Sequence, residues 1–151
     1  MSRPSDEVLQ ELADREAIRD LARLYAHYVW QKQPDSAVEL FTDDGEMDTG
    51  EEPVLRGRAE LHEAYRRMLD GAMFQPFVHN HVVTLSGGEA SGTCYLDLRA
   101  TIDGRSMIGS GWYEDIYLRV SGEWKFRSRK LVMSYLVPLE EGWATGESPP
   151  A

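Results

Sequence analysis

The segment at residues 107–138, MIGSGWYEDIYLRVSGEWKFRSRKLVMSYLVP, decides the fold of this chain. β-Branched and aromatic residues are dense on both sides of Ser121-Gly122, a pattern that predicts two long strands joined by a tight turn. Gly109 and Gly111 lie inside the first strand, where glycine commonly marks a bend or a bulge. A hairpin this long and this bent is expected to curl around other parts of the chain.

The residues before this hairpin predict helices first and strands afterwards. Apolar residues recur at helical spacing from Ser5, a plausible N-cap, to about Gln31, and residues 14–16 suggest a break into two helices. A short helix is expected at residues 36–41, and a third helix at residues 58–71. A short strand at residues 46–49 and four longer strands at 77–86, 90–102, 107–120 and 123–137 follow, separated by glycine turns.

This order predicts an α+β fold. Three N-terminal helices would cover one face of a strongly bent antiparallel sheet and close a cone around an apolar pocket, the usual place for a ligand. We expect a single domain over residues 1–144 and a disordered tail at residues 145–151.

Composition limits the possible partners. The chain of 151 residues is 42% hydrophobic, as expected of one globular domain, and its net charge is -10. This charge argues against nucleic acid and anionic membranes as partners, since both need clustered cations. The sequence has neither an apolar run long enough to span a bilayer nor a signal-peptide core, and its one cysteine, Cys94, fits a reducing compartment. We therefore expect a cytoplasmic protein.

Five segments in order resemble a known family: REAIRDLARLYAHYV, ELFTDDGEMD, LRGRAELHEAY, FVHNHVV and SGEWKFRSRKL. They resemble the SnoaL-like branch of the nuclear-transport-factor-2-like superfamily, over about residues 14–139. The wider group includes scytalone dehydratase, bile-acid dehydratase, hexachlorocyclohexane dehydrochlorinase, polyketide cyclases, ketosteroid isomerase and non-catalytic binding members. The resemblance implies an α+β cone with an apolar pocket, no cofactor, and a homodimer formed through the outer face of the sheet.

The catalytic dyad of the dehydratase and dehydrochlorinase members is missing from this sequence. The resemblance implies an Asp near the end of the long helix that orients a His at the start of the first long strand, which abstracts a proton. These two positions fall on Trp30 and Pro76, and neither residue can act as an acid or a base. Any catalytic site must therefore be built from other groups.

His79 and His81 are the first candidates for such groups. Residues at i and i+2 project from the same face of a strand, so both imidazoles are expected on one side. They could place a general base, hold a metal, or serve as framework residues with Asn80. No third ligand is evident from the spacing, so we predict no metal site.

Tyrosine and arginine side chains supply further candidates. Tyr25 and Tyr28 lie on the apolar stripe of the long helix, where a buried hydroxyl needs a partner, either a ligand oxygen or a protein group. Arg127 and Arg129 would line the pocket by the resemblance, or else pair on the surface with acids such as Glu114 or Asp115. The predicted ligand-binding residues are Tyr28, Trp30, Met47, Thr49, Pro76, Leu96, Leu98, Tyr113, Arg127 and Arg129.

Two functions of different classes follow. The first is a cofactor-free lyase or isomerase acting on an apolar cyclic molecule such as a steroid, terpenoid or polyketide. In it Tyr25 or Tyr28 would polarise a carbonyl oxygen, and His79 or His81 would remove the neighbouring proton. The second is a binding protein for a hydrophobic small molecule, with the same pocket and no turnover.

Overall fold

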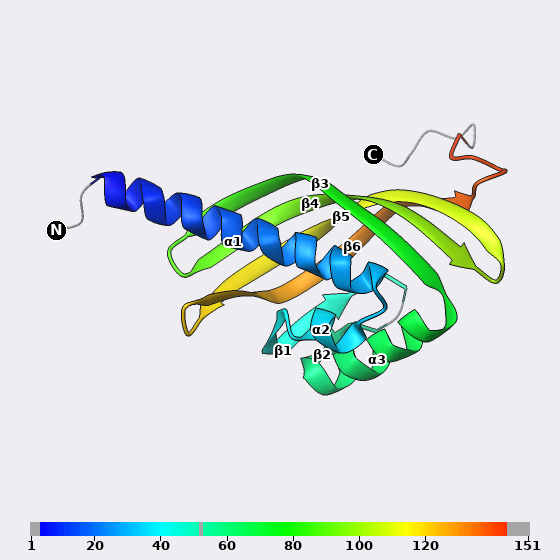
Figure 1. Ribbon diagram of the computed structural model, residues 1–151, viewed down its shortest axis with the longest axis horizontal. Coiled ribbons are helices and arrows are strands. Elements are labelled where there is room, and N and C mark those ends of the chain that lie inside the picture. Colours follow the sequence, from blue (N-terminus) through cyan, green and yellow to red (C-terminus); the bar gives the residue numbers. More distant parts are fainter. Residues whose placement is uncertain (1–3, 52, 145–151) are drawn as a thin grey trace.

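The computed structural model describes residues 4–51 and 53–144, and the predicted tail at residues 145–151 lies outside them. Three helices and six strands occupy these residues (Figure 1). Their bounds are α1 Pro4–Trp30, α2 Pro34–Val38, β1 Phe41–Asp48, β2 Leu55–Arg56, α3 Gly57–Gly71, β3 Met73–Ser86, β4 Glu89–Ile102, β5 Arg105–Val120 and β6 Glu123–Pro138. Within the described ranges no helix has the length and apolar character of a membrane span.

The six strands form one curled sheet in the order β2-β1-β6-β5-β4-β3. All neighbours are antiparallel except β1 and β6, which run parallel. The sheet does not close, because β2 and β3 are its edges. Figure 1 shows α1 lying across one face of the sheet, with α2 and α3 beside β1 and β2. The predicted α+β class, helices first and a bent sheet afterwards, is confirmed.

The bend in the sheet depends on glycine in β5. A Cβ atom at Gly111 would lie 2.1 Å from the carbonyl oxygen of Val132, a separation that no side chain permits. The pairing of β5 with β6 shifts between Ser110 and Gly111, as a bulge requires. The turn at Ser121-Gly122 has positive φ angles of 52° and 81°, the conformation expected of a tight hairpin turn. Both features agree with the sequence prediction.

Some predicted element bounds are wrong. Helix α1 is continuous through residues 14–16, because the sheet satisfies the carboxylate of Asp14: Trp124 Nε1 and Arg119 Nη1 donate to it at 3.0 and 3.1 Å. Helix α2 ends at Val38 and β1 already begins at Phe41. The short strand β2 has only two residues, too few for a sequence pattern to reveal.

A buried ion pair lies at the centre of the core. Arg129 donates from Nε and Nη2 to the two carboxylate oxygens of Asp115, at 2.7 and 3.1 Å, and both side chains are inaccessible to solvent. The guanidinium carbon lies 3.7, 4.3 and 4.5 Å from the ring centroids of Tyr113, Phe126 and Tyr25. The centre of the core is therefore polar, although aromatic side chains surround it.

We predict that Asp115→Asn lowers the free energy of unfolding by about 3–5 kcal/mol, because it leaves the Arg129 cation buried without its counter-ion. Urea unfolding measures this change. The matched control is Asp44→Asn, which weakens the exposed pair with Arg127 and should cost about 1 kcal/mol or less. Equal costs for the two substitutions would show that the buried pair does not hold the core together.

Candidate functional site

A bulge in β3 places the two candidate histidines on opposite faces of the sheet. His79 pairs with Tyr95 and Val82 pairs with Thr93, so Asn80 and His81 together oppose a single residue of β4, Cys94. Asn80 adopts a positive φ of 50°. The expectation that His79 and His81 share a face is therefore wrong, because the inserted residue breaks the period of two.

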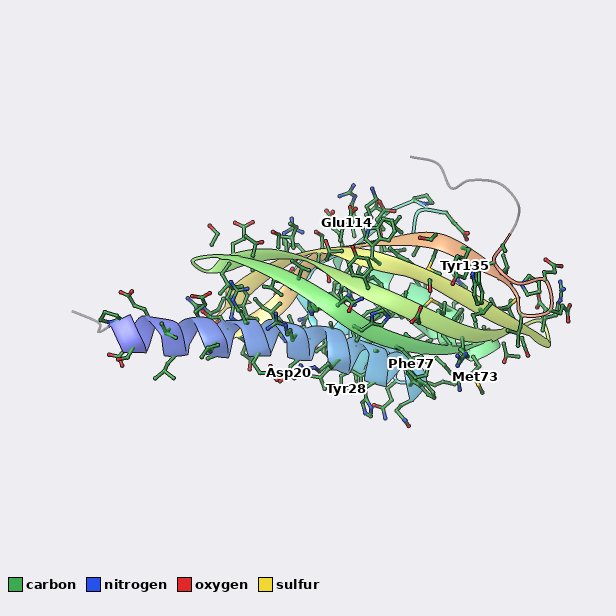
Figure 2. All side chains as sticks on the ribbon, turned by 90° about the horizontal axis from the view of Figure 1, so that it is seen from above. Asp20, Tyr28, Met73, Phe77, Glu114 and Tyr135 are labelled. Atoms are coloured by element: carbon green, nitrogen blue, oxygen red, sulfur yellow. The ribbon has the colours of Figure 1, made fainter. Side chains whose placement is uncertain are left out.

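The His79 side chain lies on the outer face of the sheet, which faces away from α1. Its Nε2 atom is 3.0 Å from Oδ2 of Asp97, whose other oxygen accepts a hydrogen bond from Ser110. The Ser110 hydroxyl and then the His79 imidazole hold the pKa of Asp97 below its ordinary value. Figure 2 shows Glu114 and Tyr135 on the side of the sheet opposite α1.

His81 faces inward and ends a chain of buried polar groups. Its Nε2 atom lies 2.7 Å from the Tyr117 hydroxyl, which donates to Asp115 Oδ2 at 2.9 Å, and Asp115 in turn pairs with Arg129. Burial and the neighbouring Asp115 carboxylate raise the pKa of Tyr117, so this tyrosine keeps its proton. The one hydroxyl proton goes to the ion-paired carboxylate, which can only accept.

This arrangement fixes the tautomer of His81. Because the Tyr117 oxygen has given its proton to Asp115, Nε2 of His81 must carry hydrogen and donate to it. The other nitrogen, Nδ1, then carries a lone pair. Nδ1 has no hydrogen-bond partner among the described residues, and it is not fully buried. His81 thus presents a fixed, accessible acceptor.

Burial lowers the pKa of His81 to about 4, and the Asp115 charge offsets only part of this effect. The cations of Arg129, Arg19 and Arg23 lower the pKa further. The imidazole is therefore neutral near neutral pH and available as a base.

A hollow of about 220 Å³ lies between α1 and the bulge of β3. Helix α1 contributes Arg19, Ala22 and Arg23. The sheet contributes Val78, Asn80, His81, Cys94 and part of His79, whose imidazole is bonded to Asp97 on the outer face. Burial raises the pKa of the Cys94 thiol to about 11, so this cysteine remains a neutral part of the wall. No three His, Cys, Asp or Glu side chains of the described ranges are grouped as metal ligands would be.

Trp30 and Pro76, at the two dyad positions, lie together in the structure. The indole Nε1 of Trp30 donates to the Pro76 carbonyl oxygen at 2.7 Å, and the ring packs edge-on against Phe77. Trp30 is 38% exposed and Pro76 is buried. A neutral hydrogen bond and an aromatic contact therefore stand where the resemblance implies an Asp and a His.

Other predicted site residues do not line this hollow. The Tyr25 hydroxyl lies 2.6 Å from the Tyr65 hydroxyl inside the core, and Tyr28 is half-buried. Tyr113 packs on Arg129. Arg127 is bound at the surface to the backbone oxygen and carboxylate of Asp44, so its predicted place in the pocket is wrong. Three of the remaining predicted ligand-binding residues, Met47, Leu96 and Leu98, are buried, and the fourth, Thr49, is half-buried.

The sequence prediction missed Asp115 and Tyr117 as members of the site. A signal was present, since residues 113, 115 and 117 alternate along one strand and all face inward. The prediction placed Asp115 on the surface as a possible partner of arginine. The predicted pairing of Asp115 with Arg129 is confirmed. The predicted surface position is wrong, because the pair is buried in the core.

Comparison with known proteins identifies relatives of the whole fold. The model of the family described as SnoaL-like domain matches residues 10–130. A hexachlorocyclohexane dehydrochlorinase (LinA, type 2) is 22% identical, with a TM-score of 0.82 over 94% of this chain and 97% of that one. A nuclear-transport-factor-2-like protein with a cystatin-like fold from Novosphingobium aromaticivorans is 20% identical, with a TM-score of 0.73 over 97% and 96%.

A third structure, provisionally named a scytalone dehydratase and also from Novosphingobium aromaticivorans, is 22% identical, with a TM-score of 0.71 over 85% and 89%. The comparison with curated proteins gives no match. At these identities the structures show the fold, and they confirm the resemblance seen in the sequence.

The low pKa of His81 predicts a loss of stability in acid. The folded pKa of about 4 lies below the ordinary value of 6.5, so the unfolded chain binds more protons between these values. The contribution of His81 should be fully present above pH 6.5 and decline as the pH falls toward 4. His81→Gln keeps an N–H donor for Tyr117 and cannot be protonated, so its free energy of unfolding should fall less.

Urea unfolding at about pH 7 and about pH 4.5 measures the difference. The control is His27→Gln at an exposed position of α1, which should follow the unsubstituted chain. An equal fall in the free energy of unfolding for His81→Gln and for the control would show that burial does not lower the pKa of His81.

Proposed function

The chain belongs to the SnoaL-like family, and from this premise we propose that it is a cofactor-free lyase or isomerase with His81 as its base. The substrate would be a cyclic, largely apolar small molecule with a carbonyl group. The observation that supports this proposal most directly is the orientation of His81, which presents the Nδ1 lone pair while Nε2 is held by Tyr117.

The proposed reaction begins with a proton on the carbon next to the carbonyl group. His81 Nδ1 takes this proton, and the electron pair of the C–H bond moves to the carbonyl oxygen as an enolate. The imidazolium that forms keeps its Nε2–H bond to Tyr117, and the Asp115 charge behind Tyr117 stabilises it. An isomerase returns the proton to another carbon, whereas a lyase expels a leaving group as the enolate collapses.

The replacement of the dyad supports a base at a new position. Trp30 and Pro76 cannot exchange protons, and His81 lies on the same strand as Pro76. Two structural neighbours are named for eliminations, a dehydrochlorinase and a dehydratase, which makes proton abstraction a reasonable expectation for this chain.

The alternative proposal is a binding protein without turnover. One observation favours it: the Tyr25 and Tyr65 hydroxyls bond each other, so neither is arranged to polarise a substrate carbonyl. In this case the hollow would hold a ligand and His81 would serve only as an acceptor for a ligand donor.

The test uses a simple model reaction, the conversion of 3-cyclohexen-1-one to its conjugated isomer, followed by ultraviolet absorbance. His81→Gln should lower kcat/KM by about 100-fold or more, the usual contribution of a general base. Tyr117→Phe should lower it by about tenfold, because the imidazolium loses the hydroxyl acceptor. His27→Gln should leave it unchanged.

Full activity in His81→Gln would reject His81 as the base. A chain that binds cyclic ketones and does not isomerise them at all would favour the binding alternative.

We also propose that two copies associate through the outer face of the sheet. Several apolar side chains are exposed on this face, at 37–62%: Val82, Tyr95 and Ile116. Neighbouring strands bring them together on one surface, and a patch of this kind is typical of an interface.

Light scattering tests this proposal. The chain should have twice the monomer mass of 17.2 kDa, and Val82→Glu should reduce it to the monomer. Leu24→Glu, at a 40% exposed position of α1, is the control and should stay dimeric. A monomer mass for the unsubstituted chain at every concentration would contradict the proposal.

A further inference from the structure

Arg19 is unusual among the arginines of this chain. Most of the described arginines lie within 4.0 Å of a carboxylate, among them Arg15, Arg23, Arg119 and Arg129. Half-buried Arg19 has no such partner in the described ranges. Its one hydrogen bond, from Nη2 to the His81 carbonyl oxygen, is long at 3.4 Å.

Arg19 lies where an unpaired cation could meet a ligand. Arg19 lines the hollow, one helical turn from Arg23, and its long contact is with the backbone of the proposed base. Arg23 cannot play the same part, because Glu16 and Asp20 bind its Nη1 atom at 2.6 and 2.9 Å. A guanidinium has five N–H donors, and within the described ranges Arg19 uses only one of them, in a long hydrogen bond.

The rest of the hollow contains no competing acid. None of the residues that line it is an aspartate or a glutamate, and Arg23 is a second cation. The chain as a whole carries a net charge of -10 and would repel an anion at long range. Selection for an anionic ligand would therefore need a local cation with free donors, which is what Arg19 supplies.

We propose that the hollow selects small molecules bearing a carboxylate, which Arg19 binds through its paired N–H donors. This inference rests on the proposed function, because it names the class of substrate for the same site. A planar guanidinium matches the two oxygens of a carboxylate, and such paired charge-assisted bonds are among the strongest polar contacts. The anchored carboxylate holds the neighbouring ring against the wall formed by Ala22, Val78 and Cys94, beside His81.

The test compares two probes of the same shape, 1-naphthoate and its neutral counterpart 1-naphthamide, by fluorescence titration. The unsubstituted chain should bind 1-naphthoate about tenfold more tightly or better, as expected of one charge-assisted pair. Arg19→Gln should remove this preference and leave the affinity for 1-naphthamide within about twofold. Arg19→Lys should keep part of the preference, since it retains the charge without the planar pair of donors.

Arg67→Gln, at an exposed position of α3 that does not line the hollow, is the matched control, and it should keep the preference for 1-naphthoate. Thermal unfolding of each variant verifies that it is folded. Equal affinity of the unsubstituted chain for the two probes, or no binding of either, would overturn the proposal. So would an Arg19→Gln variant that weakens both probes equally.

A second readout separates this proposal from the proposed catalysis. Bound 1-naphthoate places a negative charge near His81 and should raise its pKa, as followed by the imidazole signals in nuclear magnetic resonance. Arg19→Gln should abolish this shift. These measurements involve no turnover, so the two proposals can fail separately. Selectivity for a carboxylate can hold even if full activity of His81→Gln rejects His81 as the base. It can also fail even if His81→Gln is inactive, as the proposed catalysis requires.

Discussion

The buried pair of Arg129 and Asp115 is the interaction on which the other features of this structure depend. Removing two charges from water is expensive, and the cost is recovered only when the partners bond each other and the remaining polar atoms are satisfied. Asp115 is fully engaged, by Arg129 and by Tyr117. The Nη1 atom of Arg129 has no hydrogen-bond partner in the described part of the chain. Three aromatic rings enclose the guanidinium, and their attraction for the cation offsets part of the cost of this unpaired donor.

The same pair gives the hydrogen bonds around it a direction. Asp115 can only accept, so Tyr117 must donate to it, and His81 must then donate to Tyr117. A charge in the core thus determines which nitrogen of a histidine near the surface carries hydrogen. The proposed chemistry follows from this sequence of donors. Tyr117 and Asp115 support the proposed base, His81, which lies five residues beyond the dyad position at Pro76.

The sequence predicted the fold better than the site. The bent hairpin at residues 107–138 could be recognised because glycine, β-branched residues and a turn dipeptide each have one strong structural meaning. The faces of β3 could not be predicted, since a bulge at Asn80 inverts the alternation and only the pairing with Cys94 reveals it. Asp115 was placed on the surface in one of the two alternatives, since a charged residue rarely enters a core. Its partner lies fourteen residues away on the next strand.

The most direct test of this account is the protonation of His81, measured from the nitrogen chemical shifts of its imidazole as the pH is varied. The account predicts that near neutral pH hydrogen is on Nε2 and absent from Nδ1, and that the ring titrates with a pKa of about 4. Tyr117→Phe should weaken the preference for this tautomer, because the acceptor of the Nε2–H bond is lost. Hydrogen on Nδ1, or a pKa at or above the ordinary 6.5, would contradict the proposed orientation of the base.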